Sequence, residues 1–164
     1  MSEYAIYNNR RFRAVYNDGK VFLTSKKEEE GFELQSFISG FETINTYEKS
    51  VSEKEVDAVF DEEIFIRYLL NDYYLFYSPR YEDFIKDNSI RILTTNSELA
   101  HTYNFNRSEP GVYYKDILIH EIDCIILKRV PIGSHTQMSL CTDEIIVKDD
   151  VKDYLYGLHE EWKR

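Results

Sequence analysis

The sequence has few cysteines, which can cross-link a small fold, and few prolines and glycines. It contains two cysteines, three prolines and six glycines in 164 residues. Cys124 and Cys141 form no C-x-x-C pair, and each has apolar or small neighbours along the chain. Such a context is typical of buried thiols rather than of a disulfide framework. We therefore expect a fold held by its core and not by covalent bridges.

Motifs for metal, nucleotide or acyl-transfer chemistry are also missing. The widely separated histidines show no H-E-x-x-H or H-x-H spacing; they are His101, His120, His135 and His159. Zinc is therefore not predicted. The glycines form no G-x-x-x-x-G-K-[ST], G-x-G-x-x-G or G-x-S-x-G pattern, which would cradle a phosphate or expose a nucleophile. No cofactor is expected.

Positive charge is scarce. Twenty Lys and Arg face thirty Asp and Glu, which gives a net charge of −10. Proteins that bind nucleic acid need the opposite balance, because Lys and Arg displace counterions from phosphates. The composition argues against direct nucleic-acid binding and favours either simple solubility or steering towards a basic partner.

Long apolar runs are missing too. No run approaches the ~20 residues that a membrane helix needs, and MSEYAIYNNRR at the N-terminus lacks the apolar core of a signal peptide. We expect no membrane segment and a cytoplasmic location.

Aromatic residues, by contrast, are abundant. The chain has 14 Tyr and 10 Phe within a 43% apolar composition, and disordered chains lack such a supply of large groups. Tyrosine at this level suits half-buried strands, where the ring packs and the hydroxyl remains in water.

The sequence also contains an internal echo. YEKSVSEKEVDAVF (47–60) returns as YYKDILIHEIDCII (113–126), and seven positions agree without a gap: Tyr47/Tyr113, Lys49/Lys115, Val51/Ile117, Glu55/Glu121, Val56/Ile122, Asp57/Asp123 and Val59/Ile125. A repeat of roughly 65 residues is longer than the about 20–50 of solenoid repeats. We interpret it as a duplication within the chain. Because each half alone would bury only about 60% of its unfolded surface, we expect the two halves to share one core.

Hydrophobic patterning predicts short strands. The expected strands are Tyr4–Tyr7, Phe12–Tyr16, Lys20–Thr24, Ile64–Leu70, Tyr73–Tyr77 and Ile90–Thr94. Asn17-Asp18-Gly19 predicts a hairpin turn, because these residues tolerate positive φ. Asp61–Glu63, Asn71-Asp72 and Ser78-Pro79 are expected to turn or stop the chain.

The remaining segments are predicted from composition and spacing. Phe32–Thr46 is expected to be loop with some strand, residues 97–112 and 130–142 loops, and Tyr81–Asp87 one or two helical turns. Ser52-x-x-Glu55 has the pattern of a capping box, but the β-branched second copy favours strand in both echoes. Val151, Tyr154, Leu155, Leu158 and Trp162 form one apolar stripe and predict a C-terminal helix, 151–162, with acids at its start and basic residues at its end.

The predicted fold class is mainly β with a C-terminal helix (α+β). It comprises two similar small antiparallel β modules, SH3-like or half-barrel, packed together. The expected divisions are a first module over 1–62, a second over 63–130, and a connector with the terminal helix over 131–164.

His120-Glu121-x-Asp123-Cys124 is the best candidate for catalysis, because it combines a base, acids and a thiol. As a strand it would hold His120 and Cys124 about 13 Å apart on one face at about 3.3 Å per residue, and it would point both acids to the other face. The first copy has Lys54 and Ala58 at these positions. A structural cysteine is therefore the preferred interpretation, and no catalytic residue is predicted.

The acids that recur in both echoes suggest a second hypothesis, a metal site or an acid–base pair. Glu55/Asp57 and Glu121/Asp123 can bind a metal or act as acid and base, but repelling carboxylates on one strand face are more often neutralised across a hairpin. We expect Lys49 and Lys115 to face them.

Acids and aromatics near predicted turns are the candidates for contact with a partner. Rings supply buried area at an interface, and carboxylates select a basic surface. The predicted partner-binding residues are Glu28, Glu29, Glu30, Asp61, Glu62, Glu63, Tyr73, Tyr103 and Phe105.

In size, acidity, tyrosine content and lack of catalytic motifs, the whole chain resembles the small cytoplasmic immunity proteins that bacteria encode beside polymorphic toxins. The resemblance implies tight stoichiometric binding to one basic partner, a cognate toxin domain, and no catalysis. Three alternatives remain open: an acidic mimic of nucleic acid that occupies a nucleic-acid-binding protein, an enzyme for a small ligand that uses His120 and Cys124, and an adaptor that reads a peptide at a barrel edge.

Overall fold

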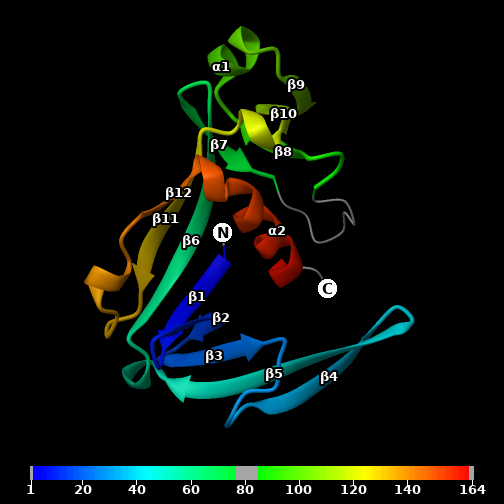
Figure 1. Cartoon of the computed structure of the whole chain (residues 1–164). Coiled ribbons are helices and arrows are strands. Elements are labelled where there is room, and N and C mark those ends of the chain that lie inside the picture. Colours follow the sequence, from blue (N-terminus) through cyan, green and yellow to red (C-terminus); the bar gives the residue numbers. More distant parts are fainter. Residues whose placement is uncertain (1, 77–84, 163–164) are drawn as a thin grey trace. The chain divides into compact units, whose positions relative to one another are not determined.

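The computed structural model describes residues 2–76 and 85–162 as antiparallel strands with short helices (Figure 1). The strands are β1 (Ser2–Tyr7), β2 (Arg10–Asn17), β3 (Lys20–Ser25), β4 (Glu33–Ser39), β5 (Glu42–Ser52), β6 (Ala58–Tyr68), β7 (Asn71–Leu75), β8 (Ser89–Thr94), β9 (Asn106–Glu109), β10 (Val112–Leu118), β11 (Cys124–Ile132) and β12 (Glu144–Val147). The helices are α1 (Ser97–Thr102) and α2 (Val151–Trp162), with 3-10 turns η1 (Glu53–Glu55), η2 (Ile119–Glu121), η3 (Met138–Leu140) and η4 (Lys148–Asp150). The fold is α+β and mainly antiparallel β, as predicted.

The chain divides into two compact units. Unit 1 comprises Met1–Glu63 and Lys128–Asp143, and unit 2 comprises Ile64–Leu127 and Glu144–Arg164. The segment 131–164, predicted as one connector with a helix, thus contributes to both units. Each unit has a hydrophobic core of its own, so the expectation that the two halves share one core is wrong.

Unit 1 is a meander with strand order β4-β5-β3-β2-β1-β6. Alternation along β2 and β3 directs one set of side chains into a core that includes Ala5, Phe12, Val21, Leu23, Val51 and Val59. The predicted hairpin turn is confirmed, because Asp18 and Gly19 have φ of 49° and 78° and Asn17 pairs with Lys20. A two-residue turn of this kind matches the twist of the strands that it joins.

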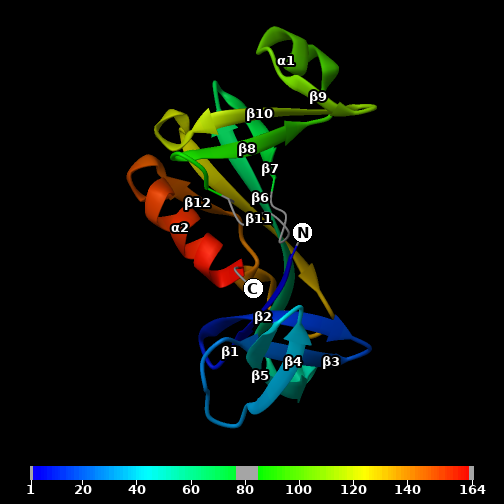
Figure 2. The same ribbon diagram turned by 90° about the vertical axis from the view of Figure 1, so that its right-hand side faces the viewer.

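Read from β1, the meander of unit 1 has the order β1-β2-β3-β5-β4, and unit 2 has the matching order β6-β7-β8-β10-β9. Strand β11 pairs with both β6 and β12. Helix α2 lies beside the strands of unit 2 (Figure 2), and its apolar stripe packs into their core. Val151, Leu155 and Leu158 are buried in the same core as Ile66, Ile92 and Ile125, so the predicted helix is confirmed at both ends. The side chain of Trp162 lies outside the described part of the chain.

The two echo segments have the same local structure. Strand β5 ends at Ser52 and β6 begins at Ala58, with η1 between them; β10 ends at Leu118 and β11 begins at Cys124, with η2 between them. The prediction of continuous strand was wrong at this turn. The rejected capping box is present, since Ser52 N donates to Glu55 Oε2 at 2.8 Å, and Leu118 N donates to Glu121 Oε2 at the same distance. The repeated glutamates therefore cap backbone turns.

Three predicted boundaries are corrected. Asp61–Glu63 does not turn the chain, because β6 continues to Tyr68 and the turn falls at Leu69–Leu70, with φ of 49° and 65°. Phe32–Thr46 is mostly hairpin rather than loop. Residues 97–112 contain α1, whose first turn is capped by Asn96 Oδ1 accepting from Glu98 N and Leu99 N, and they also contain β9. The expected stop at Ser78-Pro79 and most of Tyr81–Asp87 fall outside the described residues.

No helix within residues 2–76 and 85–162 is long and apolar enough to cross a membrane.

Candidate protein-binding surface

The hairpin of β4 and β5 carries large apolar side chains in solvent. All seven residues of β4 are exposed, and the exposed fractions are 55% for Leu34, 49% for Phe37, 81% for Ile38 and 109% for Phe41. Single exposed apolar residues are ordinary on a protein surface, whereas several on one hairpin expose a larger apolar area of the kind found at interaction sites. We call residues 33–48 the apolar hairpin.

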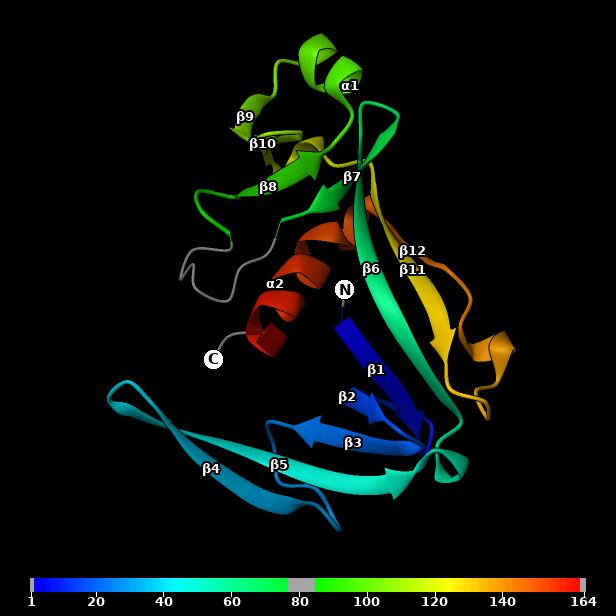
Figure 3. The same cartoon turned by 180° about the vertical axis from the view of Figure 1, so that it is seen from behind.

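The outer part of the apolar hairpin is a two-stranded ribbon (Figure 3). Strand β3 pairs with β5 only from Tyr47 to Ser52, whereas β4 pairs with β5 from Glu42 to Glu48. Residues 42–46 of β5 therefore have β4 as their one neighbour within the described chain. All of β4 is exposed here, whereas Ile44 and Thr46 of β5 are half-buried. A two-stranded ribbon of this kind is marginal in stability on its own.

Local sequence explains why this hairpin forms. Gly40 has φ of 65° at the first position of the two-residue turn, where glycine is favoured in a type II′ hairpin. Phe37 pairs across the strands with Ile44, and Ser36 Oγ donates to Asn45 Oδ1 at 2.7 Å. Gly40 between two alternating segments is the feature of the sequence that could have predicted this hairpin.

Every charged side chain of the apolar hairpin is acidic. They are Glu33, Glu42 and Glu48, and the segment contains no Lys, Arg or His. Glu33 and Glu48 are cross-strand partners, so their charges repel. The surface therefore combines apolar area with an unbalanced negative field.

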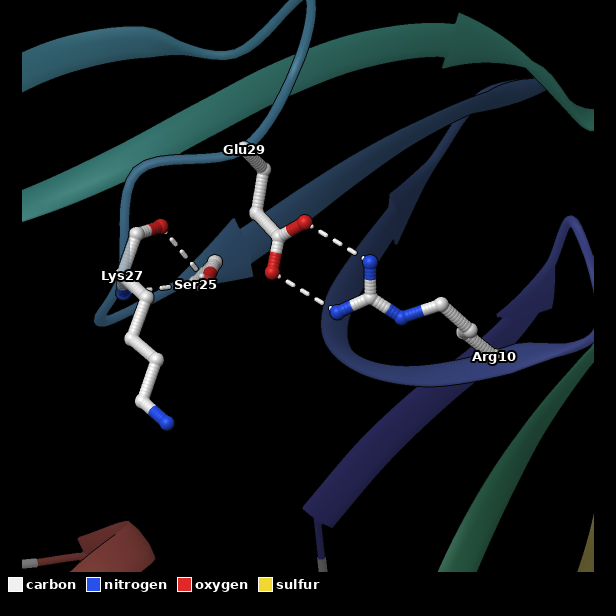
Figure 4. A network of polar contacts seen from close by, with 4 residues as sticks. All are labelled: Arg10, Ser25, Lys27 and Glu29. Carbon is white, nitrogen blue, oxygen red and sulfur yellow. Dashed lines mark hydrogen bonds and ion pairs between the residues drawn. The ribbon is translucent and has the colours of Figure 1, made fainter.

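The predicted cluster Glu28–Glu30 lies in the loop that precedes β4. Glu29 accepts two hydrogen bonds from the Arg10 guanidinium (Figure 4), each 2.7 Å long. These bonds lower the pKa of Glu29. Ser25 Oγ donates to the carbonyl of Lys27 and accepts from its N–H, which fixes the start of the loop. Glu28 and Glu30 are exposed, whereas Glu29 serves an internal ion pair.

The second predicted acidic cluster is corrected. Glu62 is buried between two arginines, with Arg11 Nη2 at 2.5 Å and Arg129 Nε at 2.8 Å from its carboxylate oxygens. A buried carboxylate needs such partners, because leaving water is costly for a charge. Asp61 and Glu63 are half-buried on the same strand. The error arose from placing a turn where β6 is continuous.

The predicted aromatic contacts also lie mainly inside the fold. Tyr73 is buried in the core of unit 2 and packs against Phe105 at 5.2 Å between ring centroids. Tyr103 and Phe105 are half-buried. Tyr73 was expected beside a turn at Asn71-Asp72, but the turn comes two residues earlier, and alternation then directs Tyr73 inwards.

Lys49 and Lys115 do not neutralise the repeated acids. Lys49 Nζ donates to Tyr7 Oη at 3.0 Å and lies 5.0 Å from the centre of its ring. Lys115 Nζ lies 5.7 Å from the ring centre of Tyr68 and donates to the carbonyl of Tyr103 at 2.7 Å. Both lysines thus cover aromatic rings with their cationic ends.

The aromatic rings beneath these lysines occupy corresponding positions. Tyr7 and Tyr68 end β1 and β6, and Phe12 and Tyr73 are the third residues of β2 and β7. The ring centroids are 6.4 Å apart for Tyr7 and Phe12, and 6.3 Å apart for Tyr68 and Tyr73. Each pair is extended by a further ring, Phe32 in unit 1 and Phe105 in unit 2.

The candidate pair His120 and Cys124 flanks the end of η2. The 3-10 turn between them replaces the strand geometry that the sequence argument assumed. Burial raises the pKa of the Cys124 thiol above its usual range, which favours the unreactive protonated form at neutral pH. The Glu121 carboxylate caps the turn by accepting a hydrogen bond from Leu118 N.

Sequence reasoning missed one cluster of polar residues in unit 1. Glu53 accepts hydrogen bonds from Tyr16 Oη at 2.8 Å and from Ser134 Oγ at 2.7 Å, and His135 Nε2 lies 3.7 Å from the same carboxylate. Nucleophilic catalysis by serine needs its hydroxyl to donate to the imidazole. Here Ser134 donates to Glu53 instead, so the cluster ties the loop after β11 to η1. No spacing in the sequence links Glu53 to Ser134.

The family model for uncharacterised conserved protein UCP033725 matches residues 1–133. The chain belongs to this family. The match includes the apolar hairpin, both echo segments and the strands from β1 to β11. No curated protein and no solved structure matches the chain.

Proposed function

We propose that this protein is a non-catalytic binding protein that neutralises one basic protein partner through the apolar hairpin. The observation that carries the proposal is the combination of four exposed apolar side chains with three acids and no base on one hairpin: Leu34, Phe37, Ile38 and Phe41 with Glu33, Glu42 and Glu48.

The two components of this surface have different roles in binding. Exposed rings and aliphatic side chains supply the buried area that slows dissociation, and aromatic anchors often dominate affinity. Unpaired acids accelerate association with a cationic surface and reject acidic competitors. An acidic nucleic-acid mimic would need carboxylates in an array, whereas apolar side chains predominate here and Glu62 is buried.

The resemblance to immunity proteins makes a bacterial toxin domain in the cytoplasm the partner that we propose. Toxins that act on nucleic acid carry the basic surface that an acidic inhibitor recognises. In this proposal the chain inhibits the toxin by binding alone, and only the toxin catalyses a reaction.

We further propose that the two units arose by duplication. Support comes from the gapless echo, from the matched strand orders of the two meanders, and from the two lysine-covered aromatic pairs. In this view, the long apolar hairpin is an elaboration of the first unit, because its counterpart, β9 with β10, has only four residues in its outer strand.

The proposal predicts that a neighbouring gene encodes a basic protein. It is tested by co-expressing the chain with that gene product and measuring rescue of growth and the dissociation constant. A Phe37→Ser/Ile38→Ser/Phe41→Ser variant is expected to lose rescue and to bind at least a hundredfold more weakly. The matched control, Met138→Ser/Ile145→Ser/Val147→Ser, removes similarly exposed apolar side chains elsewhere and is expected to retain both. Equal binding by the two triple variants, or no complex with the wild-type chain, would overturn the proposal.

A further inference from the structure

We infer that the free edge of β4 accepts an extended, lysine- or arginine-containing segment of the partner as an added antiparallel or parallel strand. This inference rests on the proposed function and adds the mode of recognition. Strand addition at an exposed sheet edge derives affinity from main-chain hydrogen bonds and specificity from alternating side chains.

The position of β4 in the sheet is the first support. It is the terminal strand of unit 1, and within the described residues it pairs only with β5. The register runs without a bulge from Glu33 opposite Glu48 to Ser39 opposite Glu42. A strand held this regularly on one side presents a regular row of backbone groups on its other side.

The turn determines which backbone groups face outwards. In a two-residue hairpin, the residues that flank the turn form a hydrogen-bonded pair, and such pairs recur at every second position. Ser39, Phe37 and Gln35 therefore bond to β5. Leu34, Ser36 and Ile38 direct their N–H and C=O groups to the open edge.

The edge of β4 lacks the usual defences against pairing. Natural edge strands are short, charged, bulged or interrupted by proline. Residues 34–39, LQSFIS, contain no charge and no proline. The outer strand of unit 2 shows the opposite pattern: β9 has four residues, including Arg107 and Glu109, and its register shifts beside Val112. The contrast within one chain indicates that the β4 edge is left open selectively.

An added strand would also complete the apolar hairpin. Leu34 and Ile38 share one face of β4, and Phe37 lies on the other beside Ile44 of β5. A third strand of about six residues, paired with the open edge of β4, would cover part of the exposed surface of these side chains. It would also turn the two-stranded ribbon into a three-stranded sheet, which is more stable.

The charges of the hairpin select the occupant. Glu33, Glu42 and Glu48 are exposed and the hairpin holds no cation, so the added segment gains from lysine or arginine between its apolar residues. A second copy of this chain is disfavoured, because each copy has a net charge of −10 and would bring another acidic hairpin.

Proline at position 36 gives a selective test. Ser36→Pro removes one N–H group that faces the open edge of β4. It keeps the hydrogen bonds between β4 and β5, because Gln35, Phe37 and Ser39 make them. Ser36→Ala is the matched control, since it removes the same bond to Asn45 and keeps the N–H. The probe is a synthetic eight-residue peptide of alternating valine and lysine, compared with its valine and glutamate counterpart. Hydrogen exchange by NMR reports on each β4 amide.

The lysine peptide is expected to slow exchange at Leu34, Ser36 and Ile38, and to bind Ser36→Pro at least tenfold more weakly than Ser36→Ala. The glutamate peptide should leave these amides unchanged. If Ser36→Pro does not fold, Ile38→Lys provides the second variant, since lysine protects natural edges, and it should also bind at least tenfold more weakly. Three results would overturn the inference: unchanged exchange rates of these amides with the lysine peptide, equal binding of that peptide by Ser36→Pro and Ser36→Ala, or a dimer of the free chain that Ser36→Pro dissociates.

The outcome is separable from that of the proposed function. If the wild-type chain and Ser36→Pro neutralise the neighbouring gene product equally well, strand addition is wrong and partner binding stands. If the wild-type chain forms no complex with that product, the proposed function fails whatever the peptide does.

Discussion

Glu3 and Asp61 lie opposite one another as cross-strand partners on β1 and β6. Like charges in this arrangement repel. Burial, and then the charge of Glu3, raise the pKa of Asp61 above its ordinary value. A carboxyl group with a raised pKa in the folded state destabilises the fold where it is ionised, and this penalty disappears below the pKa of the unfolded chain.

Asp61→Asn is therefore expected to raise the free energy of unfolding by about 1 kcal/mol at pH 7. The gain should shrink as the pH falls through the folded pKa and should vanish below about pH 4. Urea unfolding at pH 7 and below about pH 4 measures the change in the free energy of unfolding, and Glu28→Gln, at an exposed position, is the control. A gain that persists at low pH would contradict this explanation.

Glu62 is expected to be essential for stability rather than for association. Glu62→Gln removes the buried carboxylate that pairs with Arg11 and Arg129 and should cost about 3 kcal/mol. Glu63→Gln, one residue along β6 and half-buried, should cost less than about 1 kcal/mol. Chemical denaturation measures both, and equal losses would show that the two arginines do not depend on Glu62.

The hydroxyl of Tyr73 is buried and has no hydrogen-bond partner within the described residues. Tyr73→Phe is therefore expected to be neutral or to stabilise the fold by up to about 1 kcal/mol. The reciprocal change, Phe12→Tyr at the corresponding position of unit 1, should cost about 1–3 kcal/mol because it buries a hydroxyl. A marked loss in Tyr73→Phe, measured by thermal unfolding, would reveal an unrecognised partner.

Leu69 and Leu70 form a turn in which both residues have positive φ, and Leu70 is 90% exposed. The left-handed region is costly for residues with a Cβ. The corresponding turn of unit 1 uses Asn8 and Asn9, which tolerate it. Leu69→Asn/Leu70→Gly should therefore raise the free energy of unfolding by about 1–2 kcal/mol. A lower melting temperature would show that the leucines stabilise the turn by contacts of their own.

Cys124 and Cys141 are expected to react slowly in the folded protein. Burial raises the pKa of both thiols above the ordinary value, so little thiolate exists at pH 7. Labelling with a thiol reagent should be slow in buffer and rapid in denaturant, and the folded protein should need a higher pH than the unfolded chain to reach the same rate. Rapid labelling of Cys124 at pH 7, with Cys124→Ala as the control, would reopen the enzyme hypothesis.

Sequence reasoning succeeded where a local pattern determines a local structure. The apolar stripe from Val151 to Leu158 needs only helical periodicity, and Asn17-Asp18-Gly19 needs only residues that accept positive φ. It failed at Asp61–Glu63, where a local turn signal was outweighed by pairing with β1 and by the two arginines that receive Glu62. It also failed at Glu55 and Glu121, where the local capping-box pattern at Ser52 was outweighed by the β-branched residues of the second copy, although both glutamates accept from a backbone N–H three residues away.

The amino-acid sequence by itself determined the α+β class, the echo between the two segments and the acidity of the surface, because composition and periodicity are properties of the chain alone. Only the tertiary structure decided which acids and aromatics reach solvent. Burial depends on partners far apart in sequence, such as Arg129 for Glu62 and Phe105 for Tyr73. For the same reason the apolar hairpin was identified only in the fold, where, among the described residues, β4 is exposed and pairs with β5 alone.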